Sequence, residues 1–308
     1  VDLILKSGDA KAKIKLVDLR KELKDQEKVN IYFEEKDCED KFTGYTGIKV
    51  LKFKVEIDCK EIRPSKKIPL EADFGALPKD IKNRLKAGVY IRQNGELTYI
   101  KGSNVSKKGV VTFMGDMQDE YIVAEYDKKF DDMGKYEWAE EFVEVLAARE
   151  ITTGTGENSF NPEHVVTRAQ FAAFITRALG LEYTLPTNPF NDVIKGKWYA
   201  VDVLAASQSG IILGDNRGYF KPDDVVTREQ MAVIIMRAYE HKLGKHKASA
   251  ASFYDMGSVS GYAKDAVSSA RALGIISGTG SGNFEPAGKA DRAAAAKMIV
   301  KLLEHLFE

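Results

Sequence analysis

The chain has 308 residues and a mass of 34.2 kDa, which is enough for two domains that each bury a core of their own. Apolar residues make up 44% and charged residues 30%, a composition that excludes disordered and collagen-like chains. Residues 1–129 hold 27 basic and 23 acidic side chains, and the remainder holds 19 and 23. Neither half has the excess of one charge that would attract nucleic acid or an anionic membrane.

No apolar run approaches the roughly 18 residues that a membrane span needs, and no basic segment followed by an apolar run opens the chain. The sequence therefore predicts neither a membrane span nor a signal peptide. The first residue, Val1, indicates a processed product or a segment of a longer protein. Cys38 and Cys59 lack the CxxC spacing of zinc and thioredoxin-like sites, which leaves either one disulfide or two free thiols.

Residues 1–127 have the pattern of a β-rich module. Apolar side chains occupy nearly every second position of Ile48–Ile57, as in a strand with one buried face. Asn94-Gly95 tolerates positive φ at both central turn positions, so it predicts a tight hairpin of Val89–Gln93 and Glu96–Ile100. The remaining predicted elements are a short helix at Pro78–Leu85 and strands at Val29–Phe33, Val110–Phe113 and Tyr121–Tyr126. We expect an all-β sandwich- or barrel-like fold.

From Phe130 onward the pattern becomes helical and occurs three times. Each copy has an aromatic residue (Trp138, Trp198, Tyr262) that is predicted to open an amphipathic helix, and an arginine (Arg168, Arg228, Arg292) at the start of a second helix. The aromatic residue and the arginine are 30 positions apart in every copy. This constant spacing predicts three homologous units, joined by polar linkers at Leu181–Pro189 and His241–Ser252.

A Phe-x-Asp motif precedes the first helix of each copy, with the aspartates at Asp132, Asp192 and Asp255. Between the two helices lie a glycine (Gly154, Gly214, Gly278) and a Phe-x-Pro motif that begins at Phe160, Phe220 and Phe284. The first copy has Glu150 where the others have Gly210 and Gly274. Glu150 is therefore expected to adopt a positive φ that favours glycine.

The start of each second helix carries a capping signal. Thr167 with Gln170, and Thr227 with Gln230, fit the capping box, in which the first side chain accepts from the N3 amide and the N3 side chain accepts in return. In the third copy Asp291 is a good N-cap, but Ala294 cannot reciprocate. The arginine that follows the cap is unexpected, because a helix N-terminus already bears a partial positive charge.

These motifs, in this order and spacing, resemble the S-layer homology family over about 180 residues. The resemblance implies an all-α pseudo-trimer whose three prongs are helix–loop–helix repeats. It also implies an extracellular protein of the bacterial surface, anchored noncovalently to secondary cell-wall polysaccharide that is linked to peptidoglycan. In this family the ligand is often pyruvylated N-acetylmannosamine, bound in grooves between neighbouring repeats. The predicted domains are residues 1–127, followed by repeats at 128–184, 185–247 and 248–308.

The resemblance implies a ligand role for the repeated residues. Arg168, Arg228 and Arg292 would hold the carboxylate of a pyruvyl ketal at a capped helix start. Trp138, Trp198 and Tyr262 would contact the sugar ring, and Asp132, Asp192 and Asp255 would accept from its hydroxyl groups. Gly154, Gly214 and Gly278 would allow the backbone to approach closely. The alternatives are core tryptophans, helix-capping or arginine-orienting aspartates, turn glycines and arginines in surface ion pairs.

An enzyme is the competing class, for example a cell-wall hydrolase with paired carboxylates at Glu140 and Glu141 or at Asp223 and Asp224. Adjacent helical residues point apart, so solvated charges are the favoured interpretation. The four histidines form no HExxH motif, and His241 and His246 fall in the predicted linker. No cofactor is predicted. A module for protein–protein assembly of a surface lattice, and the non-catalytic tail of a polysaccharide hydrolase, stay open as alternatives.

Overall fold

The computed structural model describes residues 2–15, 17, 29–38, 41–57, 60–61, 66–93, 95–117, 120–246 and 251–307. The chain forms two compact units. The β-rich unit contains Val1–Lys128, Ala148–Glu150 and Phe307–Glu308, and the repeat unit contains Lys129–Ala147 and Ile151–Leu306. Each unit is described by itself below.

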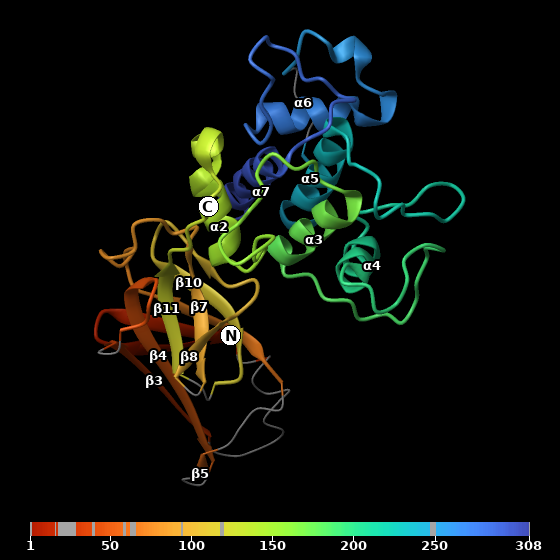
Figure 1. Cartoon of the computed structure of the whole chain (residues 1–308). Coiled ribbons are helices and arrows are strands. Elements are labelled where there is room, and N and C mark those ends of the chain that lie inside the picture. Colours follow the sequence, from red (N-terminus) through yellow and green to blue (C-terminus); the bar gives the residue numbers. More distant parts are fainter. Residues whose placement is uncertain are drawn as a thin grey trace. The chain divides into compact units, whose positions relative to one another are not determined.

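The β-rich unit is built from two antiparallel sheets, as expected from its alternating sequence (Figure 1). The first sheet contains, in spatial order, β1 (Asp2–Ser7), β2 (Ala10–Lys15), β6 (Ile68–Asp73), β10 (Val110–Gly115) and β9 (Asn104–Val105). The second contains β3 (Val29–Asp37), β4 (Tyr45–Ile57), β11 (Glu120–Tyr126), β7 (Ala87–Gln93) and β8 (Glu96–Tyr99), with β5 (Lys60–Glu61) paired to β4.

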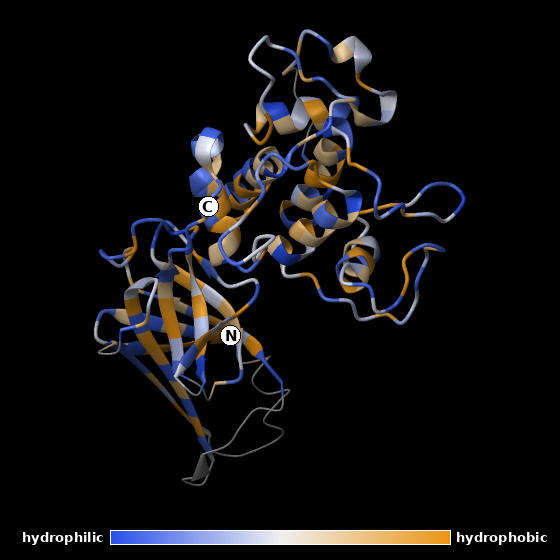
Figure 2. Cartoon of the chain, in the orientation of Figure 1, coloured by the Kyte–Doolittle hydropathy of each residue, from blue (hydrophilic) through white to orange (hydrophobic). Residues whose placement is uncertain are grey.

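One apolar core contains side chains from both sheets, for example Ile14 and Phe113 of the first sheet with Phe53 and Tyr121 of the second. Strand alternation places these side chains inside, and Figure 2 shows the resulting alternation of hydrophobic and hydrophilic bands along the strands. The predicted strand Ile48–Ile57 is confirmed as part of β4. Burying both inner faces on a common core explains why this half of the sequence alternates so regularly.

The predicted hairpin is confirmed, because Gln93 pairs with Glu96 and Gly95 has a φ of 84°. Asn94 lies outside the described residues, as does Cys59. The helix predicted at Pro78–Leu85 is wrong. The segment forms turns, in which the amide of Ile81 donates to the carbonyl oxygen of Pro78, because too few consecutive residues have helical periodicity there to offset the cost of nucleating a helix.

Each repeat contributes two helices. The first helices are α2 (Glu140–Ala148), α4 (Ala200–Gln208) and α6 (Lys264–Ala272), and the second helices are α3 (Arg168–Leu179), α5 (Arg228–Leu243) and α7 (Arg292–Leu306). Short 3-10 segments are η1 (Gly134–Ala139), η2 (Met256–Ser258) and η3 (Gly261–Ala263). Trp138, Trp198 and Tyr262 precede the first helices instead of opening them. His241 belongs to α5, so the predicted linker begins later than expected.

The second helices α3, α5 and α7 lie side by side and contact one another pairwise (Figure 1). Three isolated bridges join the turns before these helices: Thr167 pairs with Val225, Thr227 with Lys289, and Val165 with Asp291. The first repeat thus contacts the second, the second contacts the third, and the third returns to the first. Residues far apart in the chain therefore meet at each junction of a closed ring.

Candidate ligand-binding grooves between the repeats

The second helices begin at the predicted caps. The Thr167 hydroxyl accepts from the Gln170 amide at 3.2 Å, and the Gln170 side chain accepts from the Thr167 amide at 3.1 Å. Thr227 and Gln230 form the same reciprocal pair. In the third repeat the Asp291 carboxylate accepts from the Ala294 amide at 2.8 Å, without reciprocation. The caps fix where each helix starts and thereby the position of the arginine that follows.

Each of these arginines reaches into the neighbouring repeat. Arg168 donates from Nε to the carbonyl oxygen of Phe220 at 2.8 Å, and Arg228 donates to that of Phe284 at 2.7 Å. Arg292 closes the ring by donating to the carbonyl oxygen of Phe160 at 2.8 Å. Each guanidinium group also packs over the ring of the phenylalanine to whose carbonyl oxygen it donates. This contact accounts for a cation at a position that the helix dipole disfavours.

The three arginines differ in exposure. Arg292 is only 4% exposed and lies over the rings of Phe160 and Phe174. Its Nη2 atom has no hydrogen-bond partner among the described residues. Burial lowers the pKa of Arg292 to about 10. Arg168 and Arg228 are half-buried, and each uses Nη2 for a second carbonyl, that of Leu213 or of Ser277. Within the part of the chain that the structure describes, Nη1 of neither arginine makes a hydrogen bond.

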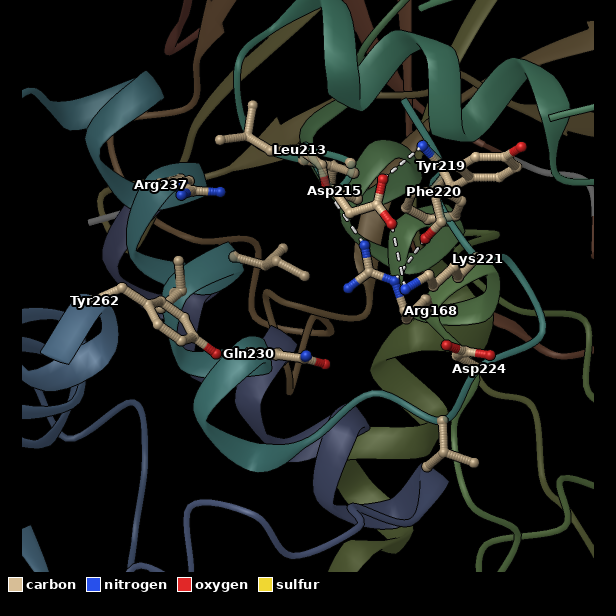
Figure 3. A pocket seen from close by; sticks show the side chains of 15 residues that line it. Arg168, Leu213, Asp215, Tyr219, Phe220, Lys221, Asp224, Gln230, Arg237 and Tyr262 are labelled. Carbon is tan, nitrogen blue, oxygen red and sulfur yellow. Dashed lines mark hydrogen bonds and ion pairs between the residues drawn. The ribbon is translucent and has the colours of Figure 1, made fainter. Parts of the chain in front are cut away.

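A cavity of about 320 Å³, the Arg168 pocket, lies beside the first of these arginines (Figure 3). Its wall combines Arg168 of the first repeat, the Leu213–Lys221 turn and helix α5 of the second, and Tyr262 of the third. Figure 3 shows the guanidinium directed into the hollow that Gln230 and Tyr262 close on the opposite side. All three repeats are therefore needed to form one pocket.

A second cavity of about 270 Å³, the Arg228 pocket, repeats this plan one step further around the ring. Arg228 comes from the second repeat, Ser277 and Gly278 come from a turn of the third, and Trp138 comes from the first. Lys297 of helix α7 also lines it, with Nζ at 5.7 Å from the centre of the Trp138 ring. The predicted arginine, glycine and aromatic side chain thus meet here, each from a different repeat.

The aromatic residues do not belong to the core. Trp138 is 51% exposed, Trp198 59% and Tyr262 61%, so the alternative of core anchors is wrong for both tryptophans. Trp138 and Tyr262 each line a pocket, whereas Trp198 lines neither. The Tyr262 hydroxyl donates to Glu229 at 3.0 Å, and burial followed by this bond raises the pKa of Tyr262 to about 12. Tyr262 is therefore a neutral aromatic face at physiological pH.

The three motif aspartates are bound within their own repeats. The Asp192 carboxylate accepts from the backbone amides of Phe220 and Lys221, and Asp132 and Asp255 make the equivalent bonds. These bonds hold a turn whose middle residue has positive φ: Asn161 at 56°, Lys221 at 59° and Glu285 at 58°. None of the three aspartates lines either pocket. Their carboxylates position the carbonyl groups to which the arginines donate.

The motif glycines have a steric reason within the repeat. A Cβ at Gly214 would come within 2.8 Å of the Phe190 ring and 2.9 Å of the Tyr219 carbonyl oxygen. Gly154 and Gly278 are crowded in the same way. Gly214 also lines the Arg168 pocket, and Gly278 lines the Arg228 pocket. In each case the same glycine therefore shapes both the turn and the pocket. Glu150 has a φ of 51°, which confirms the positive φ expected because the equivalent positions of the other repeats are glycines, Gly210 and Gly274.

Sequence reasoning missed the lining residues that belong to the second helices. Arg237 lines the Arg168 pocket and Lys297 lines the Arg228 pocket. Gln230, Ile234 and Arg237 follow the helical spacing that places residues on one face, and this signal could have found them. Asp224 also lines the Arg168 pocket, without its neighbour Asp223, so this pair of carboxylates does not face a common cleft.

A family model described as the S-layer homology domain matches residues 129–172, 189–232 and 252–296. Residues 129–296 contain three S-layer homology (SLH) domains. The chain is 36% identical over 238 residues to an amylopullulanase of Thermoanaerobacterium thermosulfurigenes, which covers 77% of this chain and 13% of that protein. It is 42% identical over 172 residues to the exoglucanase XynX of Acetivibrio thermocellus, covering 55% and 16% respectively. An S-layer protein sap of Bacillus anthracis is 27% identical over 179 residues, 58% of this chain and 22% of that protein.

The chain therefore spans less than a fifth of the length of the two hydrolases. The match to the amylopullulanase is longer than the SLH-containing part of this chain and extends into the β-rich unit. Among the described residues, no helix is long and apolar enough for a membrane span. Within the same residues, no group of three or more His, Cys, Asp or Glu side chains is placed to hold a metal ion.

Proposed function

We propose that the SLH domains anchor a bacterial surface protein noncovalently to secondary cell-wall polysaccharide linked to peptidoglycan. The observation that carries this proposal is the pair of pockets, each of which brings an arginine, a glycine turn and an exposed aromatic side chain together from three different repeats. An aromatic face packs against the apolar face of a sugar ring, and a guanidinium binds an acidic substituent. The three SLH domains and the similarity to S-layer proteins support a location at the cell surface.

The carboxylate of a pyruvyl ketal on N-acetylmannosamine is the ligand group that suits these pockets. Arg168 and Arg228 donate from Nε and Nη2 to backbone carbonyl oxygens. These bonds fix the guanidinium group, so that Nη1 is directed to the ligand. A pre-positioned cation loses little conformational entropy on binding. Arg292 is enclosed between two rings, so we assign it to packing of the third junction and not to the ligand.

Two shallow pockets on one ring suit an anchor. Each pocket alone would bind weakly, but a polymer that occupies both is retained by a raised effective concentration. We propose that the repeats, at 128–184, 185–247 and 248–308, act together as a three-pronged pseudo-trimer, because each pocket needs all three. The β-rich unit, 1–127, is then a spacer or a further binding module of the longer protein, and the chain itself performs no hydrolysis.

Sedimentation of the chain with purified cell-wall sacculi tests this proposal. We expect binding that falls after mild acid has removed pyruvyl ketals, with no soluble sugar released in a parallel assay. Binding that is indifferent to the acid treatment would place the ligand elsewhere on the wall. Release of sugar would favour the hydrolase alternative, and self-association without binding to sacculi would favour a lattice module.

A further inference from the structure

The Arg168 and Arg228 pockets share one plan but differ in the charges that line them. Three cations line the Arg168 pocket, namely Arg168, Lys221 and Arg237, together with the carboxylates of Asp215 and Asp224. Two cations line the Arg228 pocket, Arg228 and Lys297, and no carboxylate does. A ligand carboxylate would thus meet charges of both signs in the first pocket and only opposite charge in the second.

The Asp215 carboxylate already engages a cation of the Arg168 pocket. Backbone amides of Tyr219 and Arg217, together with Lys221, lower the pKa of Asp215. Lys221 Nζ lies 3.3 Å from the Asp215 carboxylate. Figure 3 marks this ion pair with a dashed line. Burial lowers the pKa of Arg168, and the charge of Asp224 is the largest effect that opposes it. Carboxylates held in this way accept hydrogen bonds well from the hydroxyl groups of an uncharged sugar.

The Arg228 pocket has different residues at the corresponding positions. Thr279 takes the place of Asp215, and Gly288 takes the place of Asp224, 64 positions later in each case. Lys297 Nζ lies 3.4 Å from the Ser277 hydroxyl and faces the pocket with Arg228. The charges of Glu285, Asp291 and Asp255 act on Arg228, but these side chains are bonded to Thr279 or to backbone amides and do not line the pocket.

We propose that the two pockets bind different sugar residues of one polysaccharide. The Arg228 pocket binds the carboxylate-bearing sugar between Arg228, Lys297 and the Trp138 face. The Arg168 pocket binds an uncharged sugar, whose hydroxyl groups donate to Asp215 and Asp224 while its ring packs on Tyr262. This assignment rests on the proposed function and narrows it: of the two arginine pockets, only the Arg228 pocket takes the pyruvyl carboxylate. The charge pattern of the polymer, in addition to its sugar composition, then determines binding.

The test compares binding isotherms of the full chain on sacculi that carry ketal-linked pyruvate and on the same sacculi after mild acid. Lys297→Gln removes one cation of the Arg228 pocket, and Lys195→Gln, at an exposed loop position, is its control. We expect Lys297→Gln to weaken binding to untreated sacculi about fivefold, with no change on treated sacculi. An equal loss on both preparations, or none on either, would overturn the assignment.

Asp224→Asn tests the Arg168 pocket, because it removes a carboxylate that lines this pocket. Asp223→Asn is its control, since it makes the same change of charge at an exposed residue that does not line the pocket. The loss of a charged acceptor for the hydroxyl groups of the sugar should make Asp224→Asn bind both untreated and treated sacculi about twofold more weakly than Asp223→Asn does. Identical affinities of these two variants would overturn the assignment. Wild-type chain that sediments with neither preparation would instead overturn the proposed function, whereas wild-type binding without these charge effects overturns the inference alone.

Discussion

Arg292, in the third repeat, donates from Nε to the carbonyl oxygen of Phe160, 132 residues earlier in the first repeat, and its guanidinium lies 4.5 Å from the centre of the Phe160 ring. This side chain closes the ring of repeats together with the bridge between Val165 and Asp291. The equivalent arginines make the other two junctions and still present part of the guanidinium to a pocket. One position of the repeat thus serves assembly in all three copies and lines a pocket in two.

Arg292→Ala is expected to destabilise the chain most among the arginine variants. It deletes a buried charged hydrogen bond and the packing between two phenylalanine rings, which should cost about 3 kcal/mol of unfolding free energy. Arg168→Ala should cost about half as much, because Arg168 is half-buried and solvent compensates part of the loss. Denaturant unfolding followed by the helical circular dichroism signal measures both, with the exposed Arg217→Ala as control.

Gly214→Ala should destabilise the second repeat by about 1 to 3 kcal/mol, because the added methyl group would overlap the Phe190 ring and the Tyr219 carbonyl oxygen. Gly261→Ala is the matched control, since a Cβ at that position meets nothing within 4 Å. Thermal unfolding of both variants checks this. Equal melting temperatures would contradict a steric requirement at Gly214.

Thr227→Ala removes the hydroxyl that accepts from the Gln230 amide, and it leaves the reciprocal bond, which the Thr227 backbone amide donates to the Gln230 side chain. We expect a loss of about 1 kcal/mol in unfolding free energy. Thr187→Ala, at an exposed loop position, should leave the unfolding free energy unchanged. A Thr227→Ser variant that restores stability would assign the effect to the cap hydroxyl and not to the lost methyl group.

Asp215 gives a pH dependence with a defined sign. Hydrogen bonds from the backbone amides of Tyr219 and Arg217 lower its pKa in the folded chain. The stabilisation is therefore complete above the unfolded value of about 3.9, and it is lost as the pH falls through the lower folded value. Asp215→Asn should lose less unfolding free energy than the wild type between pH 5 and pH 3. Parallel pH profiles of the two proteins would contradict this.

Local signals in the sequence predicted much of the repeat unit. The capping boxes at Thr167 and Thr227, the second helices and the positive φ of Glu150 each depend on a few neighbouring residues, and the structure confirms them. The same holds for the hairpin of β7 and β8, whose turn is encoded by two residues. The helix predicted at Pro78–Leu85 was wrong because a short segment contains too little periodicity to decide between a helix and successive turns.

The composition of the pockets could not be predicted, because it depends on contacts between repeats. Trp138 and Arg228 share a pocket although 90 residues separate them, and no spacing rule reports how the ring closes. The differences in the third repeat also divide between the pockets: Tyr262 lines the Arg168 pocket, and Ala294 lines the Arg228 pocket. Comparison of the copies in sequence assigns both changes to the third repeat and does not reveal that they lie in different pockets.

The most direct measurement of the central claim compares two tryptophan variants. Trp138 and Trp198 are equivalent in sequence and similarly exposed, but Trp138 lines the Arg228 pocket and Trp198 lines neither the Arg228 pocket nor the Arg168 pocket. Neither tryptophan takes part in the arginine hydrogen bonds that join the repeats, so ligand binding can be separated from folding. We predict that Trp138→Ala weakens co-sedimentation of the full chain with sacculi about tenfold, a loss typical of removing an aromatic anchor, and that Trp198→Ala changes it little. Equal affinities of the two folded variants would contradict a ligand site in the Arg228 pocket.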